Sequence, residues 1–160
     1  MILLLSKLHN IGIRGTCLSL IASYLQDRIQ IVKLNGAKSL PAKINVGVPQ
    51  GSILGPLLFL LYINDLLNQL EELIAYADDT AVPFTAVTWA ELARLCTTKL
   101  NYIYSWLFKN KLILNINKST FITFGNYIDS VPSNIEVQIN GQSLKRVTDY
   151  KYTLLECAYQ

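Results

Sequence analysis

The chain has 160 residues, of which 51% are apolar and 16% charged, and its formal net charge is +3. Enough apolar material is present for a folded core, which excludes wholesale disorder, and the charge excess is too small for a histone-like nucleic-acid binder. The cysteines are far apart in the sequence, which argues against a disulfide framework and a zinc site. The longest apolar stretch, residues 53–63, is too short to span a bilayer, and the N-terminus does not have the pattern of a signal peptide. We therefore expect an intracellular protein, in the nucleus or cytoplasm.

The first third of the chain predicts helices followed by a hairpin. Residues 3–26 have helical spacing of apolar side chains, with a break near Gly12. Residues 28–34 are rich in β-branched side chains and predict a strand, and residues 40–46 predict its return partner. Asn35-Gly36 between them is a strong signal for a tight hairpin turn.

The middle of the chain predicts a loop, a buried helix and a second hairpin. Glycine and proline mark residues 47–52 as a loop, and Ser52 is expected to cap a helix that continues to about Leu70. This helix is apolar nearly all round, which predicts deep burial. Two short strands are expected at residues 71–76 and 80–85.

The last part of the chain predicts one long helix and further strands. Thr88 and Glu91 form a capping box that opens a helix to about Lys109, with Asn110 as its C-cap. Strands are expected at residues 111–115, 119–124, 135–139 and 147–152. The succession of elements predicts an α+β fold, an antiparallel sheet covered by helices.

Asp78 and Asp79, between two predicted strands, are the first candidate site. Adjacent ionised carboxylates repel unless a cation lies nearby, and oxygen ligands suit Mg²⁺. A solvated turn is the commoner explanation of an Asp-Asp pair taken alone, because Asp is a favoured turn residue.

The loop and helix start at residues 47–56 are the second candidate site. Glycines there let a ligand come close to the backbone, and the helix N-terminus favours a phosphate. Gln50 offers donors and an acceptor for a base, whereas the alternative is a plain loop-to-helix junction. A third candidate, Lys118, is placed on a tight turn from which it could reach a triphosphate, although a solvated lysine is the commoner case. Asp65 is expected to make a structural hydrogen bond, and Trp106 to pack in the core.

Together these segments resemble a reverse transcriptase of the non-LTR, LINE-like retrotransposon group. The resemblance rests on GVPQGSILGPLLF at residues 47–59, YADD at 76–79 and LILNINK at 112–118. It implies a partial right-hand polymerase palm with a piece of the fingers over residues 1–152, followed by a divergent tail at 153–160.

The resemblance also implies roles for individual residues. Asp78 and Asp79 would bind Mg²⁺, with Mn²⁺ as a possible substitute, and Lys118 would protonate pyrophosphate. Residues that would contact template and nucleotide are Pro49, Gln50, Gly51, Ser52, Tyr76 and Ala77. The implied partners are an RNA template, a DNA primer and dNTPs, with no membrane.

One part of the family's pattern is not found in these residues. The family has a further metal-binding Asp on a strand (motif A) upstream of the first helix, and no Asp precedes Asp27 here. Two-metal chemistry needs both sides of the site, so we expect a fragment with little or no activity alone. The strand that leads to Asp78 should then have an unpaired edge.

Two other interpretations are open. The chain could be a non-catalytic nucleic-acid-binding remnant, in which case it would bind a primer-template in a salt-dependent way without turnover. It could also be an ordinary α+β domain, in which case added Mg²⁺ would not stabilise it.

Overall fold

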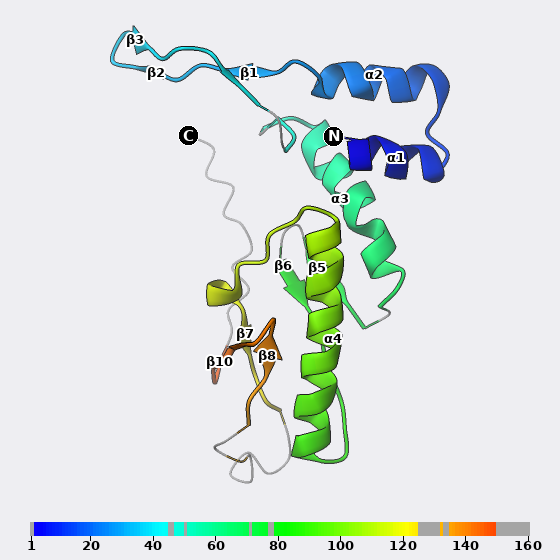
Figure 1. Ribbon diagram of the computed structural model, residues 1–160, viewed down its shortest axis with the longest axis vertical. Helices are drawn as coiled ribbons and strands as arrows, with labels where there is room; N and C mark the ends of the chain where they lie inside the picture. The colour runs from blue at the N-terminus through cyan, green and yellow to red at the C-terminus, as the bar shows by residue number, and fades with distance from the viewer. Residues whose placement is uncertain are drawn as a thin grey trace. The chain divides into compact units, whose positions relative to one another are not determined.

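The structure is a computed structural model that describes residues 2–44, 47–49, 51–70, 72–76, 79–124, 132 and 135–149. It is an α+β protein of helices and short two-stranded ladders, as predicted (Figure 1). The chain divides into two compact units, Met1–Val82 and Pro83–Gln160. Within the described residues, no helix combines the length and the apolar character that crossing a bilayer would require.

Three helices form the core of the first unit: α1 (Ile2–Asn10), α2 (Gly15–Leu25) and α3 (Leu54–Leu67). The predicted break between the first two is confirmed. The buried leucines Leu4, Leu8, Leu25 and Leu58 form one cluster in which the three helices meet. Leu4 and Leu8 are one helical turn apart, so they lie on the face of α1 that packs against the other two helices.

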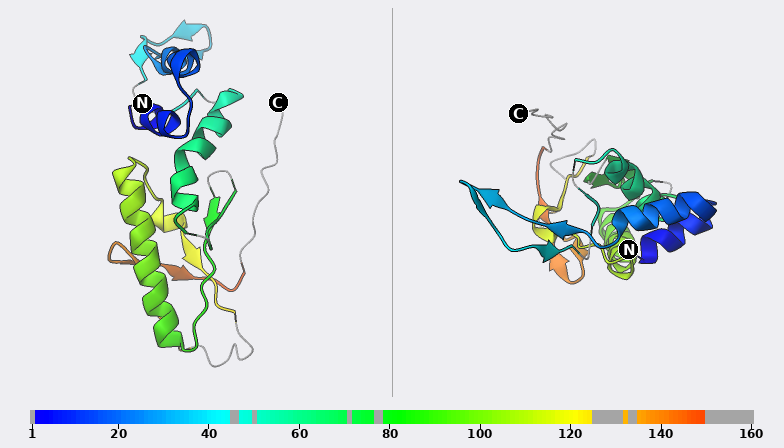
Figure 2. Two further views of the ribbon diagram at one scale, coloured as in Figure 1. Left: turned by 90° about the vertical axis from the view of Figure 1, so that its right-hand side faces the viewer. Right: turned by 90° about the horizontal axis from the view of Figure 1, so that it is seen from above.

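A long β-ribbon connects α2 to α3. Strands β2 (Lys33–Leu34) and β3 (Ala37–Lys38) flank the turn, and β1 (Ile29–Gln30) pairs with β4 (Ala42–Lys43) further along the ribbon. Asn35 and Gly36 have φ values of 48° and 84°, as a type I′ turn requires. The predicted hairpin is therefore confirmed, although its strands are shorter than predicted and residues 45–46 lie outside the described part. Figure 2 shows the ribbon extending away from α1 and α2.

The expectation that α3 is deeply buried is wrong for much of its surface. Leu58, Ile63 and Leu66 are buried, but Leu57 and Leu60 are about half exposed, at 51% and 48%. A helix that is apolar all round has more apolar surface than α1 and α2 cover.

A short hairpin, β5 (Ile74–Tyr76) with β6 (Asp79–Ala81), follows α3. The predicted second strand therefore begins one residue earlier and ends four residues earlier than expected. Of the residues between the two strands, Ala77 and Asp78 lie outside the described part of the chain.

The second unit is organised by α4 (Trp89–Lys109). The backbone N–H of Glu91 donates to Thr88 Oγ1 at 3.2 Å, and Asn110 Nδ2 donates to the carbonyl of Trp106 at 2.9 Å. Both predicted caps are thus confirmed. Trp106 is buried, as expected, together with Ile103, Val137 and Ile139.

The strands of the second unit differ from the prediction. Residues 111–115 form no strand, and Ile116–Lys118 is a 3-10 turn (η1) because Lys118 and Ser119 donate back to Asn115 and Ile116. The ladder at Asn140-Gly141 joins β8 (Gln138–Ile139) to β9 (Gln142–Ser143), not to residues 147–152. A tight turn pairs the residues that immediately flank it, which excludes the more distant segment.

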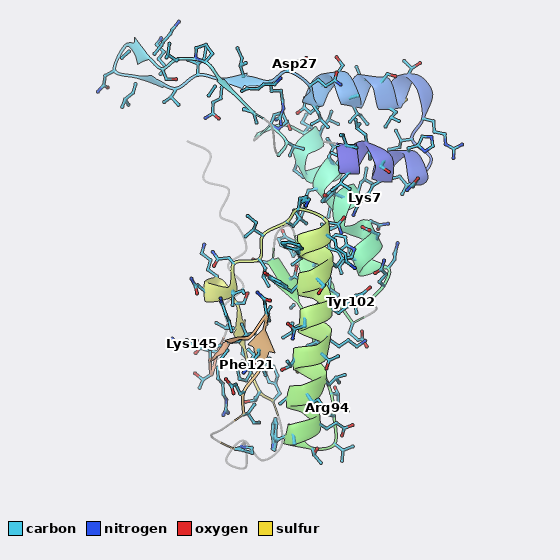
Figure 3. The ribbon with its side chains drawn as sticks, viewed as in Figure 1. Lys7, Asp27, Arg94, Tyr102, Phe121 and Lys145 are labelled. Atoms are coloured by element: carbon cyan, nitrogen blue, oxygen red, sulfur yellow. The ribbon has the colours of Figure 1, made fainter. Side chains whose placement is uncertain are left out.

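One ladder of the second unit is parallel, contrary to the expected antiparallel sheet. Strand β7 (Thr120–Phe121) pairs with β10 (Lys145–Arg146), and Phe121 and Lys145 are labelled in Figure 3. Residue 150 and the following tail lie outside the described residues.

Candidate active site

The glycine-rich loop before α3 is closed by the side chain of Ser52. Its Oγ donates to the carbonyl of Pro49 at 2.8 Å and accepts from the N–H of Gly55 at 3.0 Å. This satisfies one of the backbone donors that the first turn of a helix leaves without a partner. The prediction that Ser52 caps the helix is confirmed, whereas Gln50 lies outside the described residues.

Two glycines, one in this loop and one in the first turn of α3, are required by the local geometry. Gly51 has a φ of 74°, in the left-handed region that favours glycine. A Cβ on Gly55 would lie 3.1 Å from Ser52 Oγ and 3.4 Å from the carbonyl oxygen of Pro49. A side chain at either position would therefore disturb the closed loop.

Arg28 anchors the start of the loop to the end of α2. Its Nη2 donates to the carbonyl of Gly47 and its Nε donates to that of Leu25 at 3.3 Å. Arg28 was not predicted as part of the site, and no local pattern marks it, because 19 positions separate it from Gly47.

The β5–β6 hairpin presents the predicted acidic residue to solvent. Tyr76 and Asp79 are directly opposite in the ladder, and both are exposed. Within the described residues, the side chain of Asp79 has no hydrogen-bond or ion-pair partner. Ala77 and Asp78, also predicted site residues, lie outside the described part.

A hard divalent cation fits the chemistry of this hairpin. The exposed carboxylate of Asp79 is the kind of oxygen donor that Mg²⁺ and Mn²⁺ take in proteins. Among the residues that the structure describes, no group of three or more His, Cys, Asp or Glu side chains could hold a metal. Of the predicted pair of carboxylates, the structure describes that of Asp79, whereas Asp78 lies outside the described residues.

The outer edges of the β5–β6 hairpin are unpaired. Its ladder has two strands, and no other strand in the described ranges pairs with either of them. Whether this is the open edge expected from the sequence stays a prediction, because residues 77–78 and 150–160 lie outside the described part of the chain. Such an edge has free N–H and C=O groups that can accept a further strand.

Lys118 lies at the end of η1, and its side chain is exposed. It belongs to the second compact unit, whereas Asp79 belongs to the first. The predicted turn at this position is confirmed, although it is preceded by irregular backbone instead of a strand.

A polar contact between two apolar helices holds α1 against α3. Lys7 Nζ donates to Asp65 Oδ1 and to the carbonyl oxygen of Tyr62, both at 2.7 Å, and lies 4.4 Å from the centre of the Tyr62 ring. Burial, and then the charge of Asp65, raise the pKa of the Tyr62 phenol. The structural role expected for Asp65 is confirmed. Its partner Lys7, labelled in Figure 3, was not identified, although Asp65 is the sole charged residue of α3.

Comparison with known proteins identifies a family and several relatives that match most of this chain. A family model described as reverse transcriptase (RNA-dependent DNA polymerase) matches residues 2–153. The RNA-directed DNA polymerase from mobile element jockey of Drosophila funebris is 35% identical over 142 residues, which cover 83% of this chain and 15% of that protein. The jockey polymerase of Drosophila melanogaster is 31% identical over 141 residues, 82% of this chain and 15% of that protein.

A third relative is the probable RNA-directed DNA polymerase from transposon BS of Drosophila melanogaster. It is 30% identical over 140 residues, 81% of this chain and 15% of that protein. The chain therefore spans about 15% of the length of these curated relatives. No solved structure matches it.

Proposed function

Since this chain belongs to the reverse transcriptase family, we propose that it supplies part of the active site for RNA-templated DNA synthesis in an intact non-LTR retrotransposon protein. The observation that carries the proposal is the exposed Asp79, directly opposite Tyr76 in a hairpin that the family match includes, with no side-chain partner among the described residues. In the reaction, the 3′-hydroxyl of a DNA primer attacks the α-phosphorus of a dNTP, and pyrophosphate leaves.

The proposal gives each candidate residue a part in that reaction. Asp78 and Asp79 would hold Mg²⁺ or Mn²⁺, which neutralises charge on the phosphates when it is bound. Lys118 would donate a proton or a positive charge to the leaving pyrophosphate. Template and nucleotide contacts are assigned to the loop and to the residues before Asp78: Pro49, Gln50, Gly51, Ser52, Tyr76 and Ala77.

The described residues of the loop suit such contacts because hydrogen bonds hold their backbone in place. Ser52 closes it onto Pro49 and Gly55, and Arg28 holds its first residue, Gly47. Residues that are already held in place lose little conformational entropy when they bind a ligand. We further propose that the two units contribute to a right-hand palm with RNA template, DNA primer and dNTPs as partners.

The proposal expects little or no primer extension from these 160 residues alone. Two adjacent carboxylates supply one side of a two-metal site, and the clamp on the attacking and leaving oxygens needs the other side as well. Extension of a primed RNA by the purified chain, lost in Asp79→Asn, would show that the site is complete.

Metal-dependent stabilisation tests the proposal. The melting temperature is measured in EDTA and in increasing Mg²⁺ or Mn²⁺, and at ten times Kd the ion should add about 1.4 kcal/mol to the free energy of unfolding. Asp79→Asn should lose this increment. Asp27→Asn is a matched control, because Asp27 is exposed and its positive φ of 48° suits Asn equally well.

The alternative is a non-catalytic nucleic-acid-binding protein. It predicts nucleic-acid binding with the same melting temperature in EDTA and in Mg²⁺. Equal melting temperatures for the wild type and for Asp79→Asn at every metal concentration would decide for this alternative.

A further inference from the structure

The ribbon between α2 and α3 changes register once, at a β-bulge. At its turn, Lys33 is opposite Lys38, whereas at its base Ile29 is opposite Lys43. The N–H of Ser39 donates to the carbonyl of Val32 at 2.9 Å, so the first register extends to that pair. Between the two registers, Leu40 and Pro41 on the return strand therefore oppose one residue on the outgoing strand.

The bulge decides on which face Lys43 lies. Side chains alternate between the two faces of a strand, and a shift of one residue moves a side chain to the other face. Lys43 is opposite Ile29, which is four residues before Lys33 and therefore on the same face. Without the extra residue Lys43 would be opposite Arg28 and would lie on the other face. Pro41 suits a bulge because it has no N–H to donate to the ladder.

One face of the ribbon is therefore cationic. We call it the lysine face: Ile29, Ile31, Lys33, Lys38 and Lys43. The rise of a strand places Lys43 about 13 Å along the ribbon from the Lys33–Lys38 pair. All five side chains are exposed, with Ile29 and Ile31 at 63% and 48%.

The charges of this face are nearly uncompensated. Residues 27–44 hold four basic residues and one acidic residue, so this segment alone has a charge of +3, equal to the formal net charge of the whole chain. Asp27 contacts Lys43 at 3.3 Å, but both side chains are exposed, and such pairs contribute little. Lys33 and Lys38 make no ion pair within the described residues.

Opposing Lys33 and Lys38 is unfavourable for the isolated ribbon. They form a non-hydrogen-bonded pair, the position at which side chains across a ladder come closest, and like charges there destabilise the pairing. A polyanion across both ammonium groups would turn this repulsion into attraction. The ribbon also extends away from α1 and α2 of its own unit (Figure 2).

We propose that the lysine face binds the phosphodiester backbone of a nucleic-acid strand, at a site separate from the Asp79 hairpin. Three lysines on one face favour a ligand with repeated negative charges. The phosphates of a nucleic-acid backbone supply such charges whatever the base sequence. Ile29 and Ile31 give the same face apolar surface for sugars. The site requires neither a metal ion nor the polymerase reaction, so its test is independent of the proposed function.

The test is a binding titration of the full chain in EDTA, with fluorescence anisotropy of a labelled 20-nucleotide single-stranded RNA over a range of salt concentrations. Lys33→Gln/Lys38→Gln should weaken binding by about tenfold at low salt and reduce the slope of log K against log[salt] by about 1.4. Lys109→Gln/Lys145→Gln is the matched control, with the same charge change at exposed positions of the second unit. Neither double variant should lower the melting temperature, because all four side chains are exposed and Lys33→Gln/Lys38→Gln removes a like-charge repulsion.

Deletion of Leu40 tests whether the position of the lysines on one face matters, separately from their charge. It removes the bulge and moves Lys43 to the other face, so affinity should fall while the net charge is unchanged. Equal affinities and salt slopes for the wild type and Lys33→Gln/Lys38→Gln would overturn the proposal. The proposal would also be overturned if Lys33→Gln/Lys38→Gln weakened binding to a polyglutamate probe but not to the RNA. That result would assign the lysine face to an acidic protein segment.

Discussion

The helices and the ribbon of the first unit are stabilised in opposite ways. Leu8 and Leu58 are 0% and 2% exposed, in a cluster that joins α1, α2 and α3. In the ribbon, every residue of β1, β2, β3 and β4 is exposed. Burial therefore determines the helices, whereas turn geometry and register determine the ribbon.

This difference separates stability from binding. Substitutions among the helices should change the free energy of unfolding, and the same kind of substitution in the ribbon should not. Paired substitutions, one in each region, test this separation.

The largest effect is expected in the leucine cluster. Leu58→Ala should lower the free energy of unfolding by about 2–5 kcal/mol, because it removes buried methyl groups and leaves a cavity. Leu40→Ala in the ribbon, where Leu40 is 88% exposed, should change it by less than about 0.5 kcal/mol. Urea denaturation of both variants provides the measurement, and similar losses would contradict the distinction between the regions.

The ion pair in the helices, Lys7–Asp65, should contribute more to stability than the ion pair in the ribbon, Lys43–Asp27. Lys7→Met removes an ammonium that contacts Asp65 and Tyr62, on a side chain that is 16% exposed, and should cost about 1–2 kcal/mol. The cost is limited because Asp65 is 46% exposed and can be hydrated once Lys7 is gone. Lys43→Met breaks the exposed pair with Asp27 and should cost close to nothing. An equal effect of the two substitutions on the urea midpoint would show that burial of Lys7 does not matter.

The two serines allow a smaller comparison. Ser52→Ala removes the cap of α3 and should cost about 1 kcal/mol. Ser39 accepts from Val32 N at 3.0 Å, but in an exposed ribbon where water can replace it, so Ser39→Ala should cost less. Thermal melting of the two variants measures the difference. A larger fall in melting temperature for Ser39→Ala than for Ser52→Ala would contradict this expectation.

The smallest effect is a pH dependence in the second unit. Hydrogen bonds from Ser143, and then from Gln138, hold the pKa of the Glu136 carboxyl below its usual range. The folded state therefore binds fewer protons than the unfolded state near pH 4, so the contribution of Glu136 is present above its unfolded pKa and is lost as the pH falls. Melting temperatures from pH 6 to pH 3 should decline more steeply in the wild type than in Glu136→Gln. Parallel curves would show that these hydrogen bonds have no effect on stability.

What the sequence predicts well is local. The turn at Asn35-Gly36 and the caps at Ser52 and Thr88 agree with the structure, because each depends on residues within three positions of one another. The exposed surface of α3 was not predicted, because periodicity shows that a helix is apolar but not how much of it is covered.

Contacts between distant segments account for the other differences. The parallel pairing of β7 with β10 and the anchoring of Gly47 by Arg28 join positions whose separation leaves no local signal. For the candidate site, the segments were identified through their resemblance to a family. The positions of Tyr76, Asp79 and Ser52 come from the structure, whereas their roles remain proposals.

The central claim is that Asp78 and Asp79 bind a divalent metal ion at the β5–β6 hairpin, and paramagnetic broadening by Mn²⁺ in a ¹⁵N-labelled sample tests it most directly. Substoichiometric Mn²⁺ should broaden the amide signals of Tyr76, Asp79 and Thr80 before those of other residues. In Asp79→Asn these signals should no longer broaden first. Broadening that starts instead at Asp27 or Asp149, and that is unchanged in Asp79→Asn, would contradict a metal site at this hairpin.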